Sequence, residues 1–262
     1  MNIAIITICY NQAVTIRELH RSIFEEKSSH ARKLYLFATS PSALPVCEDL
    51  AKQTPGTYYI PYGKNVGVAR CWNEGILEAH KDNADVIIVM NDDCWFSSGD
   101  LSRLAEAAFA DRDKFAITCS GYHHHWRKRF PSHGFACVAF NPIMVDVLGC
   151  FDENFFPAYL EDCDLSYRAH LAELREGNIQ TTNVHHAGSA TIFSNSALQA
   201  QNHMTHTKNF EYYRAKWGGI NEEEVYTTPF NNPKLHPWFI DPDLRHEPYP
   251  GYNRKDQYIV RL

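Results

Sequence analysis

The stretch Asp85-Val86-Ile87-Ile88-Val89-Met90-Asn91-Asp92-Asp93 joins a continuous apolar run to three polar residues. A short apolar run rich in β-branched residues is typical of a strand that is buried on both faces. In open α/β sheets, ligands bind beyond the carboxyl ends of the strands. The stretch therefore predicts a buried strand that carries Asn91, Asp92 and Asp93 to the ligand-binding edge of a sheet.

Strands and helices alternate on both sides of this stretch. A helical segment after the first strand, for example, carries Ile16, Leu19 and Ile23 on one face. The pattern predicts strands at residues 3–9, 33–38, 57–60, 85–90 and 115–119, and further helices at residues 44–51, 68–80 and 101–110. Such alternation predicts an α/β fold, with a Rossmann-like, mostly parallel sheet flanked by helices.

The rhythm changes in the second half of the chain. The segment 122–133 is polar, aromatic and rich in histidine, which predicts a loop. Further strands are predicted at residues 135–140 and 179–184, and helices at residues 162–174 and 196–217. Six of the 13 prolines fall in residues 218–262, which predicts an extended tail. We therefore expect one domain over residues 1–218 and a Pro- and Tyr-rich C-terminal extension over residues 219–262.

Composition excludes several classes of protein. The 25 basic and 31 acidic residues give a formal charge of −6, so we expect no nucleic-acid partner. The eight cysteines include no CxxC pair, as expected of buried, reduced thiols in a cytosolic protein. The sequence shows no signal-peptide pattern, and no apolar run approaches the roughly 20 residues that span a bilayer. We expect a cytoplasmic protein without a membrane span.

The polar residues after the strand at 85–90 fit two interpretations. Carboxylates at the carboxyl end of a strand suit a hard divalent cation, because Mg²⁺ and Mn²⁺ favour oxygen ligands and are often shared with substrate phosphates. Asn and Asp also form turns and cap helices. From this turn alone, a metal site and a structural turn both remain open.

Other motifs favour the metal site. Residues 65–73 (NVGVARCWN) resemble the N-x-G-x-x-x-x-x-N segment of family-2 glycosyltransferases, and Asn91-Asp92-Asp93 resembles the D-x-D turn of that family. Residues 149–156 (GCFDENFF) resemble its G-x-F-D-E-x-F-F segment, and residues 159–165 (YLEDCDL) its E-D-x-D-L motif. Residues 186–189 (HAGS) resemble its H-x-G-S segment, and residues 216–218 (KWG) a K-W-G ending of rhamnosyltransferase-like members. The resemblance covers residues 3–219 in the family's order.

The resemblance implies the A-type glycosyltransferase fold, with a nucleotide-sugar-binding half over residues 1–120 and an acceptor half over residues 121–218. It implies that Asp93 binds Mn²⁺ or Mg²⁺ and that His186 completes the metal site or contacts the diphosphate. It also implies that Asp162 is the general base for an acceptor hydroxyl. The residues expected to contact the donor are Thr7, Tyr10, Asn11, Thr39, Asn65, Gly67, Arg70, Asn91 and Asp92. These roles agree with the chemistry, because an inverting transfer needs a proton-accepting carboxylate and a cation beside the leaving diphosphate.

Two departures from the family pattern keep alternatives open. Asn91 stands where the D-x-D turn usually begins with Asp, and Thr39 and Ser40 stand where the second strand usually ends in a base-reading Asp. A degenerate protein that only binds sugar nucleotide or glycan therefore remains an alternative, although Asp162 argues against it. A sugar nucleotidyltransferase ranks low, because residues 7–12 lack the glycine and basic residues of its phosphate-binding loop.

The sequence therefore predicts an inverting glycosyltransferase that moves a hexosyl or deoxyhexosyl group from a nucleoside diphosphate to a hydroxyl of a glycan or polysaccharide. The expected partners are the nucleotide-sugar donor and the acceptor, and a homo-oligomer is left open. Trp126 and Tyr159 have aromatic faces that suit sugar C–H surfaces. The run His123-His124-His125 predicts a solvated loop, with a role near the acceptor left open.

Overall fold

The computed structural model of the chain describes residues 1–111, 113–188, 196–220 and 222–235. The elements of the first half are β1 (Asn2–Cys9), α1 (Ala13–Phe24), β2 (Ala31–Ala38), α2 (Leu44–Gln53), β3 (Thr57–Pro61), α3 (Val68–Lys81), β4 (Val86–Asn91), β5 (Cys94–Trp95) and α4 (Asp100–Ala110). Those of the second half are β6 (Lys114–His123), β7 (Lys128–Phe130), η1 (Gly134–Ala136), β8 (Cys137–Phe140), α5 (Ile143–Leu148), α6 (Glu161–Leu171), β9 (Arg175–His186), α8 (Ser196–Trp217) and η2 (Pro229–Asn231).

The strands of the described residues form one sheet in the order β3-β2-β1-β4-β8-β6-β9-β5, with β7 paired to β6. β1 runs parallel to β2 and β4, and β2 runs parallel to β3, so these four strands end at the same edge. β8 runs antiparallel to both β4 and β6. The predicted fold class is confirmed, but the sheet is mixed rather than mostly parallel. The antiparallel pairs arise because short connections join β6, β7 and β8, whereas parallel neighbours need longer crossover connections.

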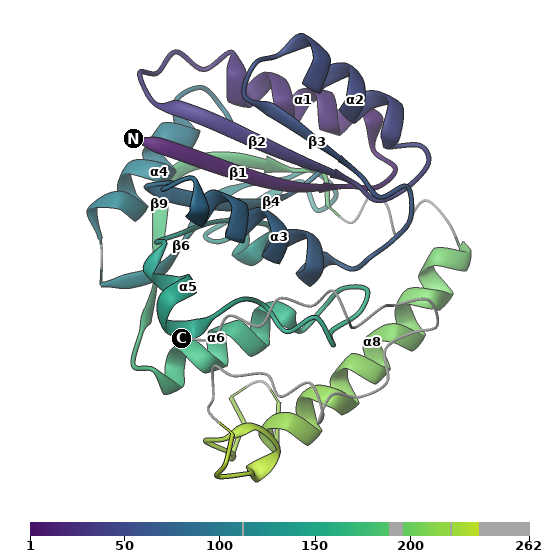
Figure 1. Cartoon of the computed structure of the whole chain (residues 1–262), viewed down its shortest axis with the longest axis vertical. Coiled ribbons are helices and arrows are strands. Elements are labelled where there is room, and N and C mark those ends of the chain that lie inside the picture. Colours follow the sequence, from purple (N-terminus) through teal and green to yellow (C-terminus); the bar gives the residue numbers. More distant parts are fainter. Residues whose placement is uncertain (112, 189–195, 221, 236–262) are drawn as a thin grey trace.

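Helices cover both faces of this sheet (Figure 1). Successive side chains of a strand point to opposite faces, so β4 contributes to two separate cores. Val86, Ile88 and Met90 pack in a core with α1, α2 and α4. Ile87 and Val89 pack in a second core with α3, α5 and α6. The apolar run that predicted a strand buried on both faces is therefore the centre of the molecule, and its carboxyl end lies between the two layers.

The histidine-rich segment 122–133 is not the loop that its polarity predicted. β6 continues to His123 and pairs with β7, which makes residues 114–130 a hairpin. β6 also pairs with β9 on its other side, with His123 opposite His186. Pairing with β9 supplies backbone hydrogen bonds that a polarity pattern does not indicate, and strand formation depends strongly on such tertiary context.

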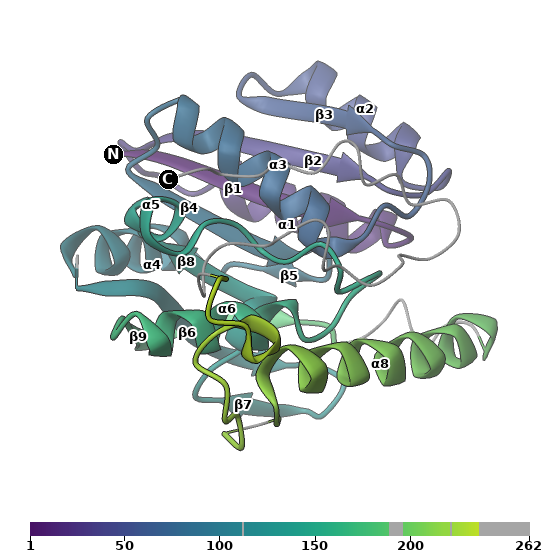
Figure 2. The ribbon, with the colours of Figure 1, turned by 60° about the horizontal axis from the view of Figure 1, so that its bottom comes forward.

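The long helix α8 packs against α6 on the side away from β2 and β3 (Figures 1 and 2). Tyr212, Tyr213 and Trp217 of α8 form an apolar core with Phe155 and Leu160, which precede α6, and Tyr167 and Leu171 of α6 pack against this core. Residues 222–235 fold back onto α8, where the backbone N–H groups of residues 225 and 226 donate to the carbonyl of Trp217, each at 3.0 Å. The start of the predicted extension thus packs on the domain, and residues 236–262 lie outside the described residues. Within the described ranges, no helix is long and apolar enough to cross a membrane.

Candidate active site

The turn after β4 is fixed by pairing between β5 and β9, in which Cys94 stands opposite His186. The backbone N–H of Ala187 donates to the carbonyl of Asp93 (2.9 Å), and that of Gly188 donates to the Asp93 carboxylate (3.2 Å). These contacts place Nε2 of His186 3.3 Å from Oδ1 of Asp93. The two residues expected to bind a metal are far apart in the sequence, and the sheet brings them together.

Asp92 ties the same turn to the end of β1. Its Oδ2 accepts a hydrogen bond from the backbone N–H of Tyr10 (2.9 Å), and its side chain is buried. Burial raises the pKa of Asp92 to about 7, although the Tyr10 N–H opposes the shift, and the nearby Asp93 carboxylate adds to it. Asp93 therefore faces His186, while Asp92 links β4 to β1.

Asp162 lies at the start of α6, directly after a strained turn. Tyr159 and Leu160 have φ angles of 80° and 73°, in the left-handed region that residues with a side chain rarely adopt. Glu161 is 5% exposed, and its Oε2 has no hydrogen-bond partner among the described residues. Burial and then the neighbouring Asp162 carboxylate raise the pKa of Glu161 well above its usual range. Asp162 is half-buried, and its Oδ1 accepts a hydrogen bond from the N–H of Cys163 (2.8 Å). The more accessible carboxylate of the pair is therefore Asp162.

A buried charge cluster of Asp152, Asp164, Arg168 and Lys216 fastens α6 to α8. Nζ of Lys216 lies 2.9 Å from Oδ2 of Asp152 and 2.5 Å from Oδ1 of Asp164. Nε of Arg168 lies 2.9 Å from Oδ2 of Asp164, and none of the four residues is more than 2% exposed. Burial alone would raise the pKa of Asp152, but the Lys216 ammonium and several hydrogen bonds hold it well below its usual range. The cluster therefore sets the position of the helix that carries Asp162.

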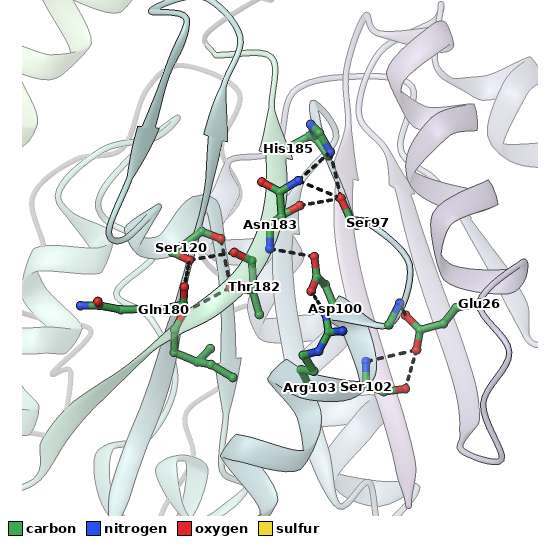
Figure 3. A network of polar contacts seen from close by, with 12 residues as sticks. Glu26, Ser97, Asp100, Ser102, Arg103, Ser120, Gln180, Thr182, Asn183 and His185 are labelled. Carbon is green, nitrogen blue, oxygen red and sulfur yellow. Dashed lines mark hydrogen bonds and ion pairs between the residues drawn. The ribbon is translucent and has the colours of Figure 1, made fainter.

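A polar network holds the end of β9 in place (Figure 3). Asp100 accepts a hydrogen bond from the backbone N–H of Asn183 (2.7 Å), and Ser97 donates to the Asn183 carbonyl (3.0 Å). Oγ of Ser97 also lies 3.0 Å from Nε2 of His185. Adjacent residues of a strand point to opposite faces, so His185 faces this network while His186 faces Asp93. The network explains why only one of the two adjacent histidines reaches the site.

A cavity of about 500 Å³ lies at the carboxyl ends of β1, β2 and β4, beside the starts of α3 and α6. This volume is within the roughly 300–1,000 Å³ that small-molecule sites occupy. The expected site residues that line it are Tyr10, Thr39, Asn65, Asn91, Asp92, Asp93, Asp162 and His186. Apolar side chains such as Ile8, Val68 and Phe135 complete the wall. The structure therefore gathers the expected base, the expected metal ligands and most of the expected donor contacts around one cavity.

Three expected donor contacts with polar side chains lie outside the cavity wall. Thr7 is fully buried within β1. Asn11 accepts a hydrogen bond from the hydroxyl of Ser42 (2.6 Å). Arg70 forms an ion pair with Glu74, in which Nε and Oε1 are 3.1 Å apart. The helical i,i+4 spacing makes this pair, which is why Arg70 lies along α3 rather than over the cavity.

Gly67 also lies outside the wall, and its conformation serves packing. Its φ is 92°, and a Cβ atom there would lie 2.9 Å from Cδ2 of Phe156. The next residue, Val68, donates its N–H to the carbonyl of Pro157 (2.8 Å). The glycine thus lets the start of α3 approach residues 156–157, which lead into the strained turn before α6.

Comparison with known proteins gives the family. The profile described as Glycosyl transferase family 2 matches residues 4–159, more than half of the chain. The chain belongs to glycosyltransferase family 2. No curated protein sequence matched the chain.

Solved structures agree with this family's A-type fold. The mannosyltransferase PcManGT from Pyrobaculum calidifontis, in complex with GDP-Man and Mn²⁺, matches at a TM-score of 0.59 and 15% identity, over 80% of this chain and 64% of that chain. S. aureus TarS matches at a TM-score of 0.56 and 14% identity, over 74% of this chain and 38% of that chain. At these identities the likeness concerns the fold, and this chain spans less than two thirds of either structure.

Three polar residues of this family-2 chain line the cavity without having been assigned a role there: Trp72, His133 and Glu161. Trp72 is 3% exposed, and its Nε1 has no hydrogen-bond partner among the described residues. It lies one helical turn after Val68, so spacing along α3 could have indicated it. His133 donates from Nε2 to the Val184 carbonyl (3.2 Å), and burial lowers its pKa to about 4. No sequence signal indicated His133, because it lies in the segment interpreted as a loop.

The Asp93–His186 pair could hold a divalent cation. Ligand atoms of Asp93, Cys94 and His186 lie within 4.8 Å of one another. Cys94 is fully buried in the core with α1, α2 and α4, whereas Asp93 and His186 both line the cavity. A carboxylate and an imidazole at a cavity edge are suitable ligands for a metal that is shared with a substrate. The residues present therefore fit the metal that the A-type fold commonly uses.

Proposed function

We propose that this chain is an inverting, metal-assisted glycosyltransferase that moves a hexosyl or deoxyhexosyl group from a nucleoside diphosphate to a hydroxyl of a glycan or polysaccharide. One observation carries the proposal: the same cavity is lined by the Asp93–His186 pair and by Asp162. Displacement at an anomeric carbon needs a charge-stabilising site for the leaving group and a base for the attacking hydroxyl. In the cavity, the charge-stabilising pair Asp93–His186 comes from the ends of β4 and β9, and the proposed base Asp162 comes from α6.

The donor nucleotide would bind at the ends of β1 and β2, where Tyr10, Thr39 and Asn65 line the cavity. Because threonine is uncharged, this position presents no negative charge to a nucleotide base. The Thr39 hydroxyl donates to the carbonyl of Cys9 (3.1 Å). Oδ1 of Asn65 accepts the N–H of Gly67 (3.0 Å), which fixes the position of this neutral side chain at the cavity wall. We therefore expect base recognition through neutral hydrogen bonds instead of a carboxylate.

Asp93 and His186 would hold the cation. When bound, it supplies positive charge that stabilises the leaving diphosphate. The mixed donor set favours Mn²⁺ over Mg²⁺, because Mg²⁺ is bound almost entirely by oxygen atoms. That PcManGT was solved with Mn²⁺ supports the same choice.

Asp162 would take the proton from the acceptor hydroxyl. The acceptor oxygen then forms its bond to the anomeric carbon as the bond from that carbon to the diphosphate oxygen breaks, and the configuration inverts. The proton ends on Asp162, and the electron pair of the broken bond leaves with the diphosphate. Glu161 is a poorer base here, since it is less accessible than Asp162 and burial favours the neutral form of its carboxyl group.

The proposal is tested by release of nucleoside diphosphate from UDP-, GDP-, TDP- and CDP-sugars with Mn²⁺ or Mg²⁺, with GDP-mannose included because PcManGT was solved with it. We expect slow donor hydrolysis that EDTA and Asp93→Ala abolish. Asp93→Ala should also weaken Mn²⁺ binding, measured by electron paramagnetic resonance without donor. His185→Ala is the matched control, because His185 faces the polar network instead of Asp93.

A second variant separates transfer from binding. Asp162→Asn keeps the shape of the side chain but removes the base, so it should bind donor and fail to transfer. If no donor binds or turns over with either metal, the function is wrong. Full activity of Asp162→Asn would remove Asp162 from the mechanism while leaving the family assignment intact.

A further inference from the structure

The turn between β6 and β7 forms an exposed aromatic and basic surface, which we call the basic hairpin and define as residues 124–130. Residues 124–129 are exposed, and the large indole of Trp126 is 58% exposed. Three consecutive cations, Arg127, Lys128 and Arg129, follow it. An exposed tryptophan beside clustered cations is unusual in a chain whose formal charge is −6.

The basic hairpin is connected to the cavity through stacked rings. The indole of Trp126 stacks on His123, with ring centroids 4.3 Å apart and an interplanar angle of 19°. His123 in turn contacts His186, with centroids 4.7 Å apart. His186 lines the cavity and faces Asp93. The exposed indole is therefore only two ring contacts from the place where the leaving diphosphate is proposed to lie.

The three cations of the basic hairpin have different roles. Arg129 is held by β9, because its NH2 donates to the Thr182 carbonyl (3.0 Å) and its NH1 donates to Oδ1 of Asn183. Nζ of Lys128 lies 4.7 Å from the ring centroid of Phe130. Within the described ranges, neither Arg127 nor Lys128 forms an ion pair with an acidic residue. Arg129 thus anchors the turn, and Arg127 and Lys128 present positive charge to solvent.

The local sequence keeps this charge uncompensated. Between Asp113 and Asp152 the chain has a single acidic residue, Asp146, which is far from the turn in sequence. Guanidinium groups bind carboxylates and phosphates with two parallel hydrogen bonds, and ammonium groups bind them as point charges. On an otherwise acidic protein, such a surface attracts anions locally while the rest of the molecule repels them.

We propose that the basic hairpin binds the acceptor, and that the acceptor is an anionic glycan. One of its sugar rings stacks on Trp126, and its carboxylate or phosphate groups pair with Arg127 and Lys128, while the hydroxyl that receives the sugar reaches Asp162 in the cavity. This inference rests on the proposed glycosyl transfer and names the class of its acceptor. A glycan is favoured over a membrane surface because the ring contacts of Trp126 lead into the cavity.

The test measures glycan binding directly, without donor or turnover. The probes are an oligomer of uronic acids, a sugar oligomer joined by phosphodiesters, a neutral glucan oligomer of similar length, and vesicles of phosphatidylcholine with phosphatidylglycerol. We expect one or both anionic oligomers to bind and the neutral oligomer to bind much more weakly. The two anionic arms distinguish carboxylate from phosphate as the recognised group.

Variants locate the binding on the hairpin. Arg127→Gln with Lys128→Gln should weaken binding of the anionic oligomer by at least about tenfold, since each lost charge-assisted hydrogen bond has roughly that effect. Trp126→Ala should weaken it as well. The matched control is Arg17→Gln with Lys52→Gln, two exposed cations on α1 and α2, which lie away from β7 (Figure 2). All substituted side chains are exposed, so the melting temperature should stay close to that of the wild type.

Three results would overturn the inference: equal binding of neutral and anionic oligomers, unchanged binding in the hairpin variants, or hairpin-dependent binding to vesicles without binding to either anionic oligomer. The outcome is independent of the enzymatic test. If no nucleoside diphosphate is released, the proposed function is refuted even when anionic glycans bind the basic hairpin. If no anionic glycan binds, the acceptor class is refuted even when the donor is hydrolysed.

Discussion

Lys216→Met is the most demanding test of the structural argument, because Lys216 is 2% exposed and contacts two buried carboxylates. Methionine is close to lysine in length, so the change removes the charge with little change in volume. It leaves Arg168 as the only cation of the buried charge cluster against Asp152 and Asp164. Removing one partner of a buried ion pair costs about 3–5 kcal/mol, because the remaining charge stays buried. For a domain of this size, roughly 2–4 °C are lost per kcal/mol, so the melting temperature should fall by roughly 6–20 °C.

The control is Lys52→Met, since Lys52 is 71% exposed and pairs with Glu48 across one helical turn at 2.6 Å. Such exposed pairs are screened by solvent and contribute little to stability, so this variant should melt within about 2 °C of the wild type. Adding Asp152→Asn to Lys216→Met removes the excess negative charge and should recover part of the loss. Equal melting temperatures for Lys216→Met and Lys52→Met would refute the idea that the cluster holds α6.

The pH dependence gives an independent check on the same residues. The pKa of Asp152 is lowered in the folded wild type, so its stabilising contribution is present above the ordinary Asp pKa and is lost as the pH falls below it. Without Lys216, burial would raise that pKa, and protonation in acid would then stabilise the variant. The difference in unfolding free energy between wild type and Lys216→Met should therefore shrink from pH 7 to pH 4, measured by urea denaturation at each pH.

Two further changes test other parts of the structure. Gly75→Ala should destabilise the protein by about 1–3 kcal/mol in urea denaturation, because a Cβ there would lie 2.6 Å from Cγ2 of Ile6 and α3 would have to move away from β1; an unchanged midpoint would contradict that packing. Glu161→Gln should flatten the dependence of the unfolding free energy on pH. Because the pKa of Glu161 is raised in the folded state, the wild type loses stability as the pH rises from the pKa of the unfolded chain toward that of the folded protein. The neutral amide of glutamine has no such loss. A profile as steep as that of the wild type between pH 4 and pH 8 would show that Glu161 is not buried in this way.

Local patterns predicted the first half of the fold well. The strand of residues 85–90 appears as β4 one residue later, and the helix predicted at 68–80 appears as α3, one residue longer. These elements are governed by apolar runs and helical periodicity, which are local properties. The continuation of β6 to His123 and its pairing with β7 could not be predicted in this way, since residues 122–130 are largely polar and the strand depends on pairing with β9.

The candidate site was only partly predictable for a similar reason. Family motifs indicated Asp93 and His186, but their contact depends on the register between β5 and β9, which no motif encodes. Arg70 was expected at the donor, and its partner Glu74, four residues away on the same helix, was overlooked. Trp72 was recognisable from helical spacing, whereas His133 reaches the cavity only through tertiary structure.

The buried charge cluster has a consequence for the order in which the protein becomes active during its synthesis. The side of the cavity proposed to bind the donor is built from β1, β2 and β4, all of which lie within the first 91 residues. The helix with Asp162, in contrast, is fastened by Lys216 and Trp217, which a ribosome adds more than 50 residues later. On the proposed function, the strands of the nucleotide side are therefore synthesised well before the proposed base, Asp162, is fixed in position. We would then expect a chain that lacks α8 not to transfer sugar, and glycosyl transfer to begin only once α8 has been made.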